Sequence, residues 1–292
     1  MKKFLIFVFK IVVLIFLSAF LLDVLYTSVY LNSINRDKIF NVVNSKKKEY
    51  DLVIVGSSRA NNHFITKIFV DKGIKTYNYG MSGSTLQETL LLLKIMIENQ
   101  FKIKNVLIEV DLNLSTEGFS EGTRAKFMPF IKKTKVISEF YENKIDSYNW
   151  LCYLPFYRYI KYEAKIGLRE FFLNLIEKKS AYLLNGGFTP LIGKGTELAY
   201  DLRLRKAKTN VYYEEIKKIC IQNKINCIAI TTPICANTKG MNYFKKIKEI
   251  YPEIIRYDKF IDEDVFFSSC GHMNEEGARV LTERVIQDFF KK

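Results

Sequence analysis

The sequence predicts an α/β protein: a three-layer, doubly wound parallel sheet with an apolar N-terminal helix and a large, mostly helical insertion. Short β-branched apolar runs alternate with segments of helical periodicity, which is typical of a parallel sheet covered by helices on both faces. Because 48% of the 292 residues are hydrophobic, a disordered chain is excluded. At ~100–200 residues per domain, the length fits one large domain or two small ones.

The first predicted element is an apolar helix from Phe4 to Leu22, interrupted by one lysine and one serine. At ~1.5 Å per residue it would span ~28 Å, about the hydrocarbon thickness of a bilayer. No good A-x-A-like cleavage site follows it, so we expect an uncleaved anchor over residues 1–31 and a linker over 32–50. Lys2 and Lys3 favour a cytoplasmic N-terminus, although basic residues in the linker weaken the asymmetry. We therefore predict a single-pass membrane protein with an extracytoplasmic main domain.

The main domain is predicted over residues 51–292. Its expected strands are 51–56, 76–80, 105–110, 226–232 and 254–257, and its expected helices are 86–101, 211–222, 243–250 and 274–290. Asn274 is the expected N-cap of the closing helix, with two glutamates in the first turn, where the helix dipole favours acidic residues. The order of these elements predicts parallel strands connected by helices.

The segment 113–208 is too long for a βα loop, so we treat it as an insertion. It holds 17 of the 42 aromatic residues, and its 17 basic and 10 acidic residues give it a net charge of +7. Either the insertion builds a small core of its own, or it forms a lid or platform that faces membrane or glycan. Its turn signal at 185–190 would then suit a loop over the active site.

The whole chain carries 45 basic and 31 acidic residues, a net charge of +14. Such an excess indicates either an anionic neighbour, such as a phosphate-rich polymer, an acidic glycan or a membrane surface, or compositional drift. No known nucleic-acid-binding motif is present, so nucleic acid is not an expected partner. The five cysteines form no CxxC and no zinc-ligand spacing, so we predict neither a metal site nor a disulfide scaffold.

Three predicted strand ends carry small polar residues: Gly56-Ser57-Ser58-Arg59, the segment 78–85, and Asp111-Leu112-Asn113. Ligands of open α/β sheets bind at the carboxyl ends of the strands. A serine there needs a histidine to accept its proton and N–H donors for the developing oxyanion. Of the two histidines, His272 precedes the last helix and is the candidate base, whereas His63 is interpreted as incidental.

In this order the blocks resemble the SGNH (GDSL-like) hydrolase superfamily. The matching blocks are Gly56-Ser57-Ser58, Asn78-x-Gly80-x-x-Gly83-x-Thr85, Val110-x-x-Asn113 and His272-Met273-Asn274-x-x-Gly277-Ala278. The resemblance implies a flavodoxin-like SGNH fold, with Ser58 as nucleophile and His272 as general base. It further implies an oxyanion hole made by the N–H groups of Ser58 and Gly83 and the side-chain amide of Asn113.

The sequence departs from the family pattern at two places. The family aspartate three residues before the histidine is replaced by Ser269, so Asp264 or Asp262 would supply the carboxylate, or the site would work as a Ser–His dyad. The third block, which ends at Asn113, lacks the family's glycine.

Other residues near these blocks have alternative interpretations. Ser57 and Ser58 could also cap the following helix. Arg59 is either a solvated charge or a contact for an anionic substrate. Cys270 occupies no strand-end turn, so a Cys–His site with His272 is not favoured.

An anchor, an extracytoplasmic domain and an insertion together resemble the cell-envelope members of the family, such as the D-alanyl transfer protein of teichoic acid operons. The resemblance implies an acyl esterase or O-acyltransferase that modifies a cell-surface polysaccharide or teichoic-type polymer through a serine acyl-enzyme, without a cofactor. Expected partners are the polymer, membrane lipid and a membrane-bound O-acyltransferase. The alternative is a catalytically degenerate SGNH-fold protein that binds glycan or assists an acyltransferase.

Overall fold

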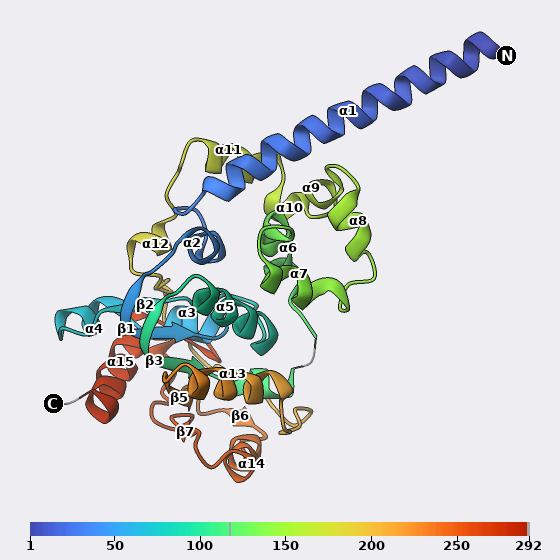
Figure 1. Cartoon of the computed structure of the whole chain (residues 1–292). Coiled ribbons are helices and arrows are strands. Elements are labelled where there is room, and N and C mark those ends of the chain that lie inside the picture. Colours follow the sequence, from blue (N-terminus) through green and yellow to red (C-terminus); the bar gives the residue numbers. More distant parts are fainter. Residues whose placement is uncertain (117, 291–292) are drawn as a thin grey trace. The chain divides into compact units, whose positions relative to one another are not determined.

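The structure, a computed structural model, describes residues 1–116 and 118–290 (Figure 1). The chain forms two compact units. The N-terminal unit combines Met1–Ser45 with Arg124–Lys179, and the sheet unit combines Lys46–Thr123 with Ser180–Lys292. These boundaries differ from the predicted ones, because only part of the predicted insertion leaves the sheet unit and that part joins the N-terminal segment.

The sheet unit is built on a five-stranded parallel sheet with the strand order β2-β1-β3-β5-β7. The strands are β1 Glu49–Val55, β2 Thr76–Asn78, β3 Lys102–Glu109, β5 Asn226–Thr231 and β7 Ile255–Arg256. Each overlaps a predicted strand, so the predicted α/β class with a parallel sheet is confirmed. The order along the sheet reverses between β1 and β3, and such a switch point is where open α/β sheets bind ligands.

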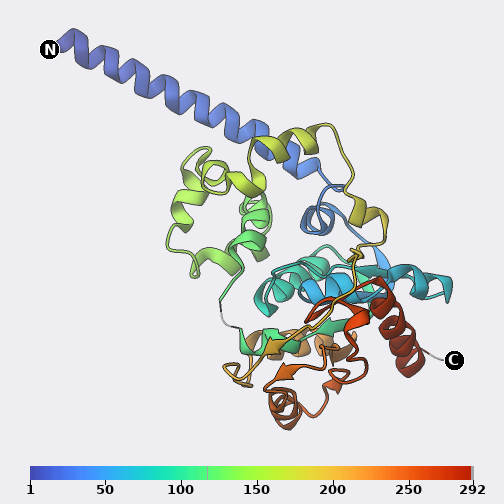
Figure 2. The ribbon, with the colours of Figure 1, turned by 180° about the vertical axis from the view of Figure 1, so that it is seen from behind.

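Helices cover both faces of the sheet (Figure 2). On one face Leu52, Ile54 and Leu107 join a buried cluster with side chains of α3 Ser58–His63, α4 Thr66–Asp71 and α15 Glu275–Phe289. Alternation along the strands turns Val53, Val55 and Val106 to the opposite face. The remaining long helices of this unit are α5 Leu86–Glu98, α13 Val211–Gln222 and α14 Asn242–Ile250.

Short elements complete the sheet unit. The strands β4 Tyr200–Asp201 and β6 Thr238–Lys239 pair in parallel, and β8 Phe267–Ser269 pairs antiparallel with β9 His272–Met273. The short helices are η1 Asp111–Ser115, α12 Ala181–Leu184 and η3 Asp264–Phe266. The predicted cap of the closing helix is confirmed, because the Asn274 side chain accepts a hydrogen bond from Gly277 N–H at 3.0 Å.

The N-terminal unit begins with α1 Lys2–Asn32, whose most apolar window has a mean hydropathy of 3.0 and is unburied. By length and composition α1 could cross a membrane. A membrane anchor and a signal sequence both have these properties. The segment predicted as a linker contains a second helix, α2 Lys38–Asn44, because its apolar residues Phe40, Val42 and Val43 are buried. The segment predicted as a linker is therefore partly helical.

The insertion is divided between the units. Its helices α7 to α11 lie in the N-terminal unit, α6 Glu121–Phe127 lies at the boundary, and η2 Met128–Phe130 follows it. The bounds of the others are α7 Lys135–Glu142, α8 Tyr148–Tyr153, α9 Tyr157–Lys161, α10 Glu163–Ile166 and α11 Leu168–Leu175. These helices make a core with the end of α1, where the ring of Tyr26 stacks on Phe171 at 4.1 Å.

The turn at 185–190 stays in the sheet unit and packs against β2 and α3. Gly186 O accepts a hydrogen bond from Asn78 N–H at 2.9 Å, and Thr189 N–H donates to Asn61 O at 3.0 Å. A Cβ on Gly187 would lie 1.9 Å from Asn78 O, so only glycine allows this approach. The turn therefore holds the edge of the sheet beside the glycine block.

Candidate active site

The turn after β1 divides two tasks between adjacent serines. Ser57 is the N-cap of α3, and its Oγ accepts a hydrogen bond from Arg59 N–H at 3.3 Å. Ser58 is the first residue of the helix, and its Oγ lies 2.8 Å from His272 Nε2. The capping and nucleophile interpretations of the serine pair thus apply to different residues, because only one hydroxyl is used by the cap.

His272 reaches Ser58 from β9, 214 positions along the chain. Both side chains are half-buried. The contact joins the first and the last of the four sequence blocks, and a neutral imidazole at this distance can accept the hydroxyl proton. The structure therefore brings together the predicted nucleophile and the predicted base.

The backbone on each side of His272 is bound by α3, the helix that carries Ser58. Arg59 Nε donates to Gly271 O at 2.8 Å, and Met273 N–H donates to His63 Nε2 at 3.0 Å. His63 is fully buried, so it is a structural residue of the site and its interpretation as incidental is corrected. A single short helix thus fixes the distance between the serine and the histidine.

Arg59 does not face solvent. Its side chain is 4% exposed, and Nη1 donates to Asp111 Oδ2 at 2.6 Å while Nη2 donates to Pro233 O at 3.0 Å. The prediction that Arg59 contacts an anionic substrate is therefore wrong, because its guanidinium is hydrogen-bonded to buried groups of the protein. Asp111 also accepts from Thr232 N–H and Thr232 Oγ1, both at 2.7 Å. Burial raises the pKa of Asp111, against the opposing effects of the Arg59 charge and the Thr232 hydrogen bonds.

Glu109 at the end of β3 supports the serine turn, a role that the sequence interpretation missed. Its Oε2 accepts hydrogen bonds from Ser57 N–H at 2.9 Å and from Ser57 Oγ at 2.6 Å. The carboxylate is fully buried, and its Oε1 has no hydrogen-bond partner within the described residues. An acidic residue at the end of an otherwise apolar buried strand was the available signal, because a buried carboxylate requires donors.

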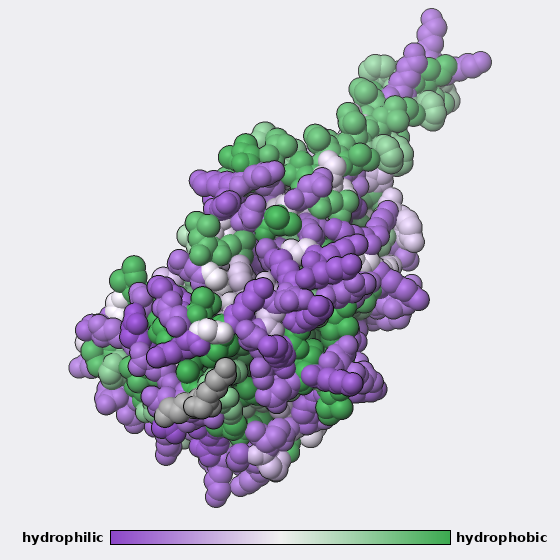
Figure 3. Space-filling model, turned by 60° about the vertical axis from the view of Figure 1, so that its left-hand side comes forward, coloured by the Kyte–Doolittle hydropathy of each residue, from purple (hydrophilic) through white to green (hydrophobic). Residues whose placement is uncertain are grey.

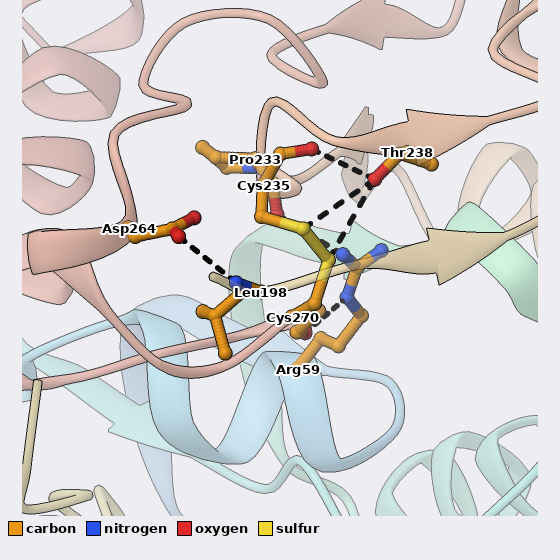
Figure 4. The surroundings of a disulfide bond; sticks show 8 residues. Arg59, Leu198, Pro233, Cys235, Thr238, Asp264 and Cys270 are labelled. Carbon is orange, nitrogen blue, oxygen red and sulfur yellow. Dashed lines mark hydrogen bonds between the residues drawn. A yellow bond between two sulfur atoms is a disulfide. The ribbon is translucent and has the colours of Figure 1, made fainter. Parts of the chain in front are cut away.

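A disulfide between Cys235 and Cys270 links the loop after β5 to the loop that carries His272 (Figure 4). The two Cα atoms lie 5.2 Å apart, and Thr238 Oγ1 donates to Cys235 O at 2.7 Å. Cys152, Cys220 and Cys227 are free. A single cross-link is no disulfide scaffold, and the separation of 35 residues has no diagnostic pattern that could have revealed it.

Asp264 does not orient His272 as predicted. Asp264 lies in η3, and its Oδ2 accepts a hydrogen bond from Leu198 N–H at 2.9 Å (Figure 4). Within residues 1–116 and 118–290, no carboxylate hydrogen-bonds to His272. Asp264 is held in its place by a backbone donor, so its assignment as the orienting acid is corrected. The geometry is that of a Ser58–His272 dyad.

The predicted oxyanion donors follow three adjacent strands. Ser58 follows β1, Gly83 lies in the turn after β2 with φ +78°, and Asn113 lies in η1 after β3. A Cβ on Gly83 would meet only Ser120 Oγ at 3.7 Å, so its positive φ is what requires glycine. All three residues are at the carboxyl edge of the sheet, and the convergence of their donors on one oxygen stays a prediction.

Within the part of the chain that the structure describes, no group of three or more His, Cys, Asp or Glu residues is suited to a metal ion.

If Ser58 and His272 act as nucleophile and base, esterase activity should show an acid limb below the ordinary titration range of histidine. Burial and then the nearby Arg59 charge lower the pKa of His272 from 6.5, and burial, Arg59 and His272 lower the pKa of His63 further. Only the neutral imidazole accepts a proton, so activity should be lost as pH falls below 6.5, with a midpoint under that value, and should stay level through neutral pH. The profile of kcat/KM against pH for an activated acetate ester measures this. A midpoint above 6.5 would contradict the electrostatic environment described for His272.

Comparisons with known proteins give little further information. No model of a known protein family matches the chain, and no curated protein is similar to it in sequence. Among solved structures it is similar to one described as "a putative platelet activating factor from Streptococcus pneumonia", with 9% identity, a TM-score of 0.37, and coverage of 98% of this chain and 99% of that one. A likeness at this level supports no argument about activity, so the site stands on its own geometry.

Proposed function

We propose that the protein is a serine acyl esterase or O-acyltransferase of SGNH (GDSL-like) type. The observation that supports this most directly is the 2.8 Å contact between Ser58 Oγ and His272 Nε2. The contact lies at the carboxyl edge of the sheet, after β1, beside the point where the strand order reverses. A hydroxyl paired with an imidazole there is suited to covalent acyl transfer.

The reaction proceeds in two steps. His272 accepts the proton of Ser58 as Oγ attacks the ester carbonyl, and the N–H groups of Ser58 and Gly83 with the Asn113 amide receive the oxyanion. The departing alcohol takes the proton from His272 and leaves an acyl group on Ser58. In the second step His272 deprotonates water or a sugar hydroxyl, which attacks the acyl carbonyl. As the bond between the acyl group and Ser58 Oγ breaks, His272 returns the proton to Ser58. Without a carboxylate partner, the imidazolium is less stabilised, so we expect slower turnover than a complete triad gives.

For location and substrate we propose an uncleaved anchor with a cytoplasmic N-terminus and an extracytoplasmic sheet unit. Two observations support this: α1 continues without a break into residues that pack in the N-terminal unit, and the sheet unit contains a disulfide, which persists in oxidising compartments. The net charge of +14 suits an anionic envelope polymer, so a cell-surface polysaccharide or teichoic-type polymer is the proposed acceptor. A membrane-bound O-acyltransferase is the proposed source of acyl groups.

A fluorophosphonate probe tests the activated serine in the wild-type full chain. The probe phosphonylates a serine hydroxyl whose proton is removed by a neighbouring base. We expect one adduct, located at Ser58 by fragmentation of the peptide that contains both serines of the turn. Heat-unfolded protein is the control and should not react. An adduct at Ser57 or at another residue, or no adduct on folded protein, would overturn the proposal.

A second candidate function is favoured by the missing carboxylate at His272. A catalytically degenerate SGNH-fold domain would keep the sheet and the residues around Ser58 and His272 but would bind glycan or assist an acyltransferase without forming an acyl-enzyme. Folded protein that fails to react with the probe, yet is retained by an acyl-bearing envelope polymer, would support this function in place of catalysis.

A further inference from the structure

The end of α1 is hydrogen-bonded to the insertion at two successive turns of the helix. Asp23, the first residue after the apolar run, accepts hydrogen bonds at 2.8 Å from Arg158 Nη2 and from Phe156 N–H. One helical turn later, Thr27 Oγ1 lies 2.8 Å from the hydroxyl of Tyr159. The α8–α9 turn and α9 therefore contact α1 just after its apolar run over residues 4–22.

The helices around this junction expose several large apolar side chains. In α8 and α9, Trp150 is 60% exposed, Tyr153 73% and Ile160 66%. The segment from α11 onward exposes four more, which are Leu168, Phe172, Leu175 and Ile176. We call these seven residues the α8–α11 surface. In Figure 3, hydrophobic colour is not limited to the projecting helix but continues onto the protein around its end.

The apolar residues of α11 lie along one side of the helix. Leu168, Phe172 and Leu175 are separated by four and three positions, which places them on a single stripe. The stripe borders the face of Phe171, whose ring stacks on Tyr26 of α1. The exposed apolar side of α11 is therefore a continuation of the contact with α1.

Basic residues alternate with these apolar ones. Residues 124–179 contain 12 basic and 6 acidic residues. Lys161, Lys165 and Arg169 are exposed within the same helices. Amphipathic aromatic side chains such as Trp and Tyr, together with basic side chains, are typical of the layer between lipid tails and anionic headgroups.

We propose that the α8–α11 surface lies in the headgroup layer of the membrane that α1 spans. The proposal rests on the proposed role of α1 as an anchor. A lipid surface is favoured over a second copy of the chain because the patch begins where the apolar run of α1 ends, and because two identical basic patches would repel each other. The insertion thereby holds the N-terminal unit against the bilayer instead of leaving it free on a single helix.

Trp150 provides the test, because it is the only tryptophan of the chain. The full chain is inserted into nanodiscs of phosphatidylcholine and phosphatidylglycerol, with and without lipids brominated in the upper part of the acyl chain, which quench nearby tryptophan. We expect Trp150 emission to be blue-shifted and quenched by the brominated lipid, and only weakly quenched by acrylamide in the water. The wild-type protein is sufficient for this measurement, so no variant has to fold.

Two single-tryptophan variants calibrate the depth. Trp150→Phe combined with Phe9→Trp places the probe in the middle of the apolar run, and Trp150→Phe combined with Ile34→Trp places it beyond the end of α1. Ile34 lies beyond Asn32, the last residue of α1. The nine residues from Asp23 to Asn32 alone span ~14 Å along the helix axis. Quenching of Trp150 by brominated lipid should fall between the quenching of these two variants.

Each other outcome has a distinct meaning. Trp150 emission that matches the Ile34→Trp variant would overturn the surface while leaving the anchor intact. Protection of Trp150 from both quenchers, dependent on protein concentration, would assign the surface to a protein partner instead. Lack of lipid quenching in the Phe9→Trp variant would overturn the anchor and with it the surface. The acyl-enzyme chemistry is read by the fluorophosphonate probe and is independent of all three.

Discussion

Replacing Ser58 with alanine should lower kcat/KM for an ester substrate by ~10³–10⁴-fold. The substitution removes the hydroxyl that lies 2.8 Å from His272 Nε2, and with it the acyl-enzyme, while the remaining donors of the site still orient the ester. Hydrolysis of an activated acetate ester by the full chain measures the loss. If the Ser58→Ala variant kept the wild-type rate on every ester that the wild type hydrolyses, the serine mechanism would be excluded.

Ser57→Ala is the matched control, because the adjacent serine has the same chemistry but no contact with the base. It should keep its rate within ~10-fold and should lose about 1 kcal/mol of stability from the α3 cap and about 1.5–3 kcal/mol from the hydrogen bond to Glu109. Glu109 would then keep a single donor, the amide of residue 57, at 2.9 Å. Equal losses of rate in the two variants would indicate that the turn, and not the Ser58 hydroxyl, carries the effect.

Local pattern was sufficient to predict the sheet and the order of its elements. The run from Asp51 to Val55 is β-branched and apolar, and it forms β1 because both faces of that strand are buried. Asn274 caps α15 because its side chain needs only a neighbour three residues away. The meeting of Ser58 and His272 is not local, and it was predicted through the order of four blocks that resemble a family.

The supporting residues could not be predicted because their partners are distant in the sequence. From the sequence alone, Arg59 is a polar residue in the first turn of a helix. Its burial depends on the carbonyl groups of Pro233 and Gly271, which are more than 170 positions away. The unit boundaries were missed for the same reason. Periodicity indicates that helices form between 124 and 179, but nothing in it indicates that Tyr26 supplies their core.

Replacing Arg59 with methionine should destabilise the sheet unit by about 3–5 kcal/mol, because the buried carboxyl group of Asp111 loses its only cationic partner among the described residues. The Gly271 and Pro233 carbonyls also lose their donor, so the loop that carries His272 is released. Native-state hydrogen exchange of the sheet-unit peptides measures the loss in this unit by itself. Arg284→Met is the control, since its exposed pair with Asp288 should make no measurable contribution.

The double variant Arg59→Met/Asp111→Leu separates stability from positioning. Removing both charges relieves the unpaired carboxylate, so much of the stability should return, while activity should stay low because Gly271 O remains without its donor.

The pH dependence of stability gives a second test of the same cause. In the Arg59→Met single variant the loss of the guanidinium raises the pKa of Asp111 in the folded state further above its unfolded value. Burial already raises the pKa of Asp111 to about 7 in the wild type, so the two folded proteins differ in the charge of Asp111 only above that pH. The destabilisation relative to wild type should therefore grow as pH rises above neutral and should shrink as pH falls below it. A destabilisation that is independent of pH would mean that the variant fails by lost packing and not by the stranded charge of Asp111.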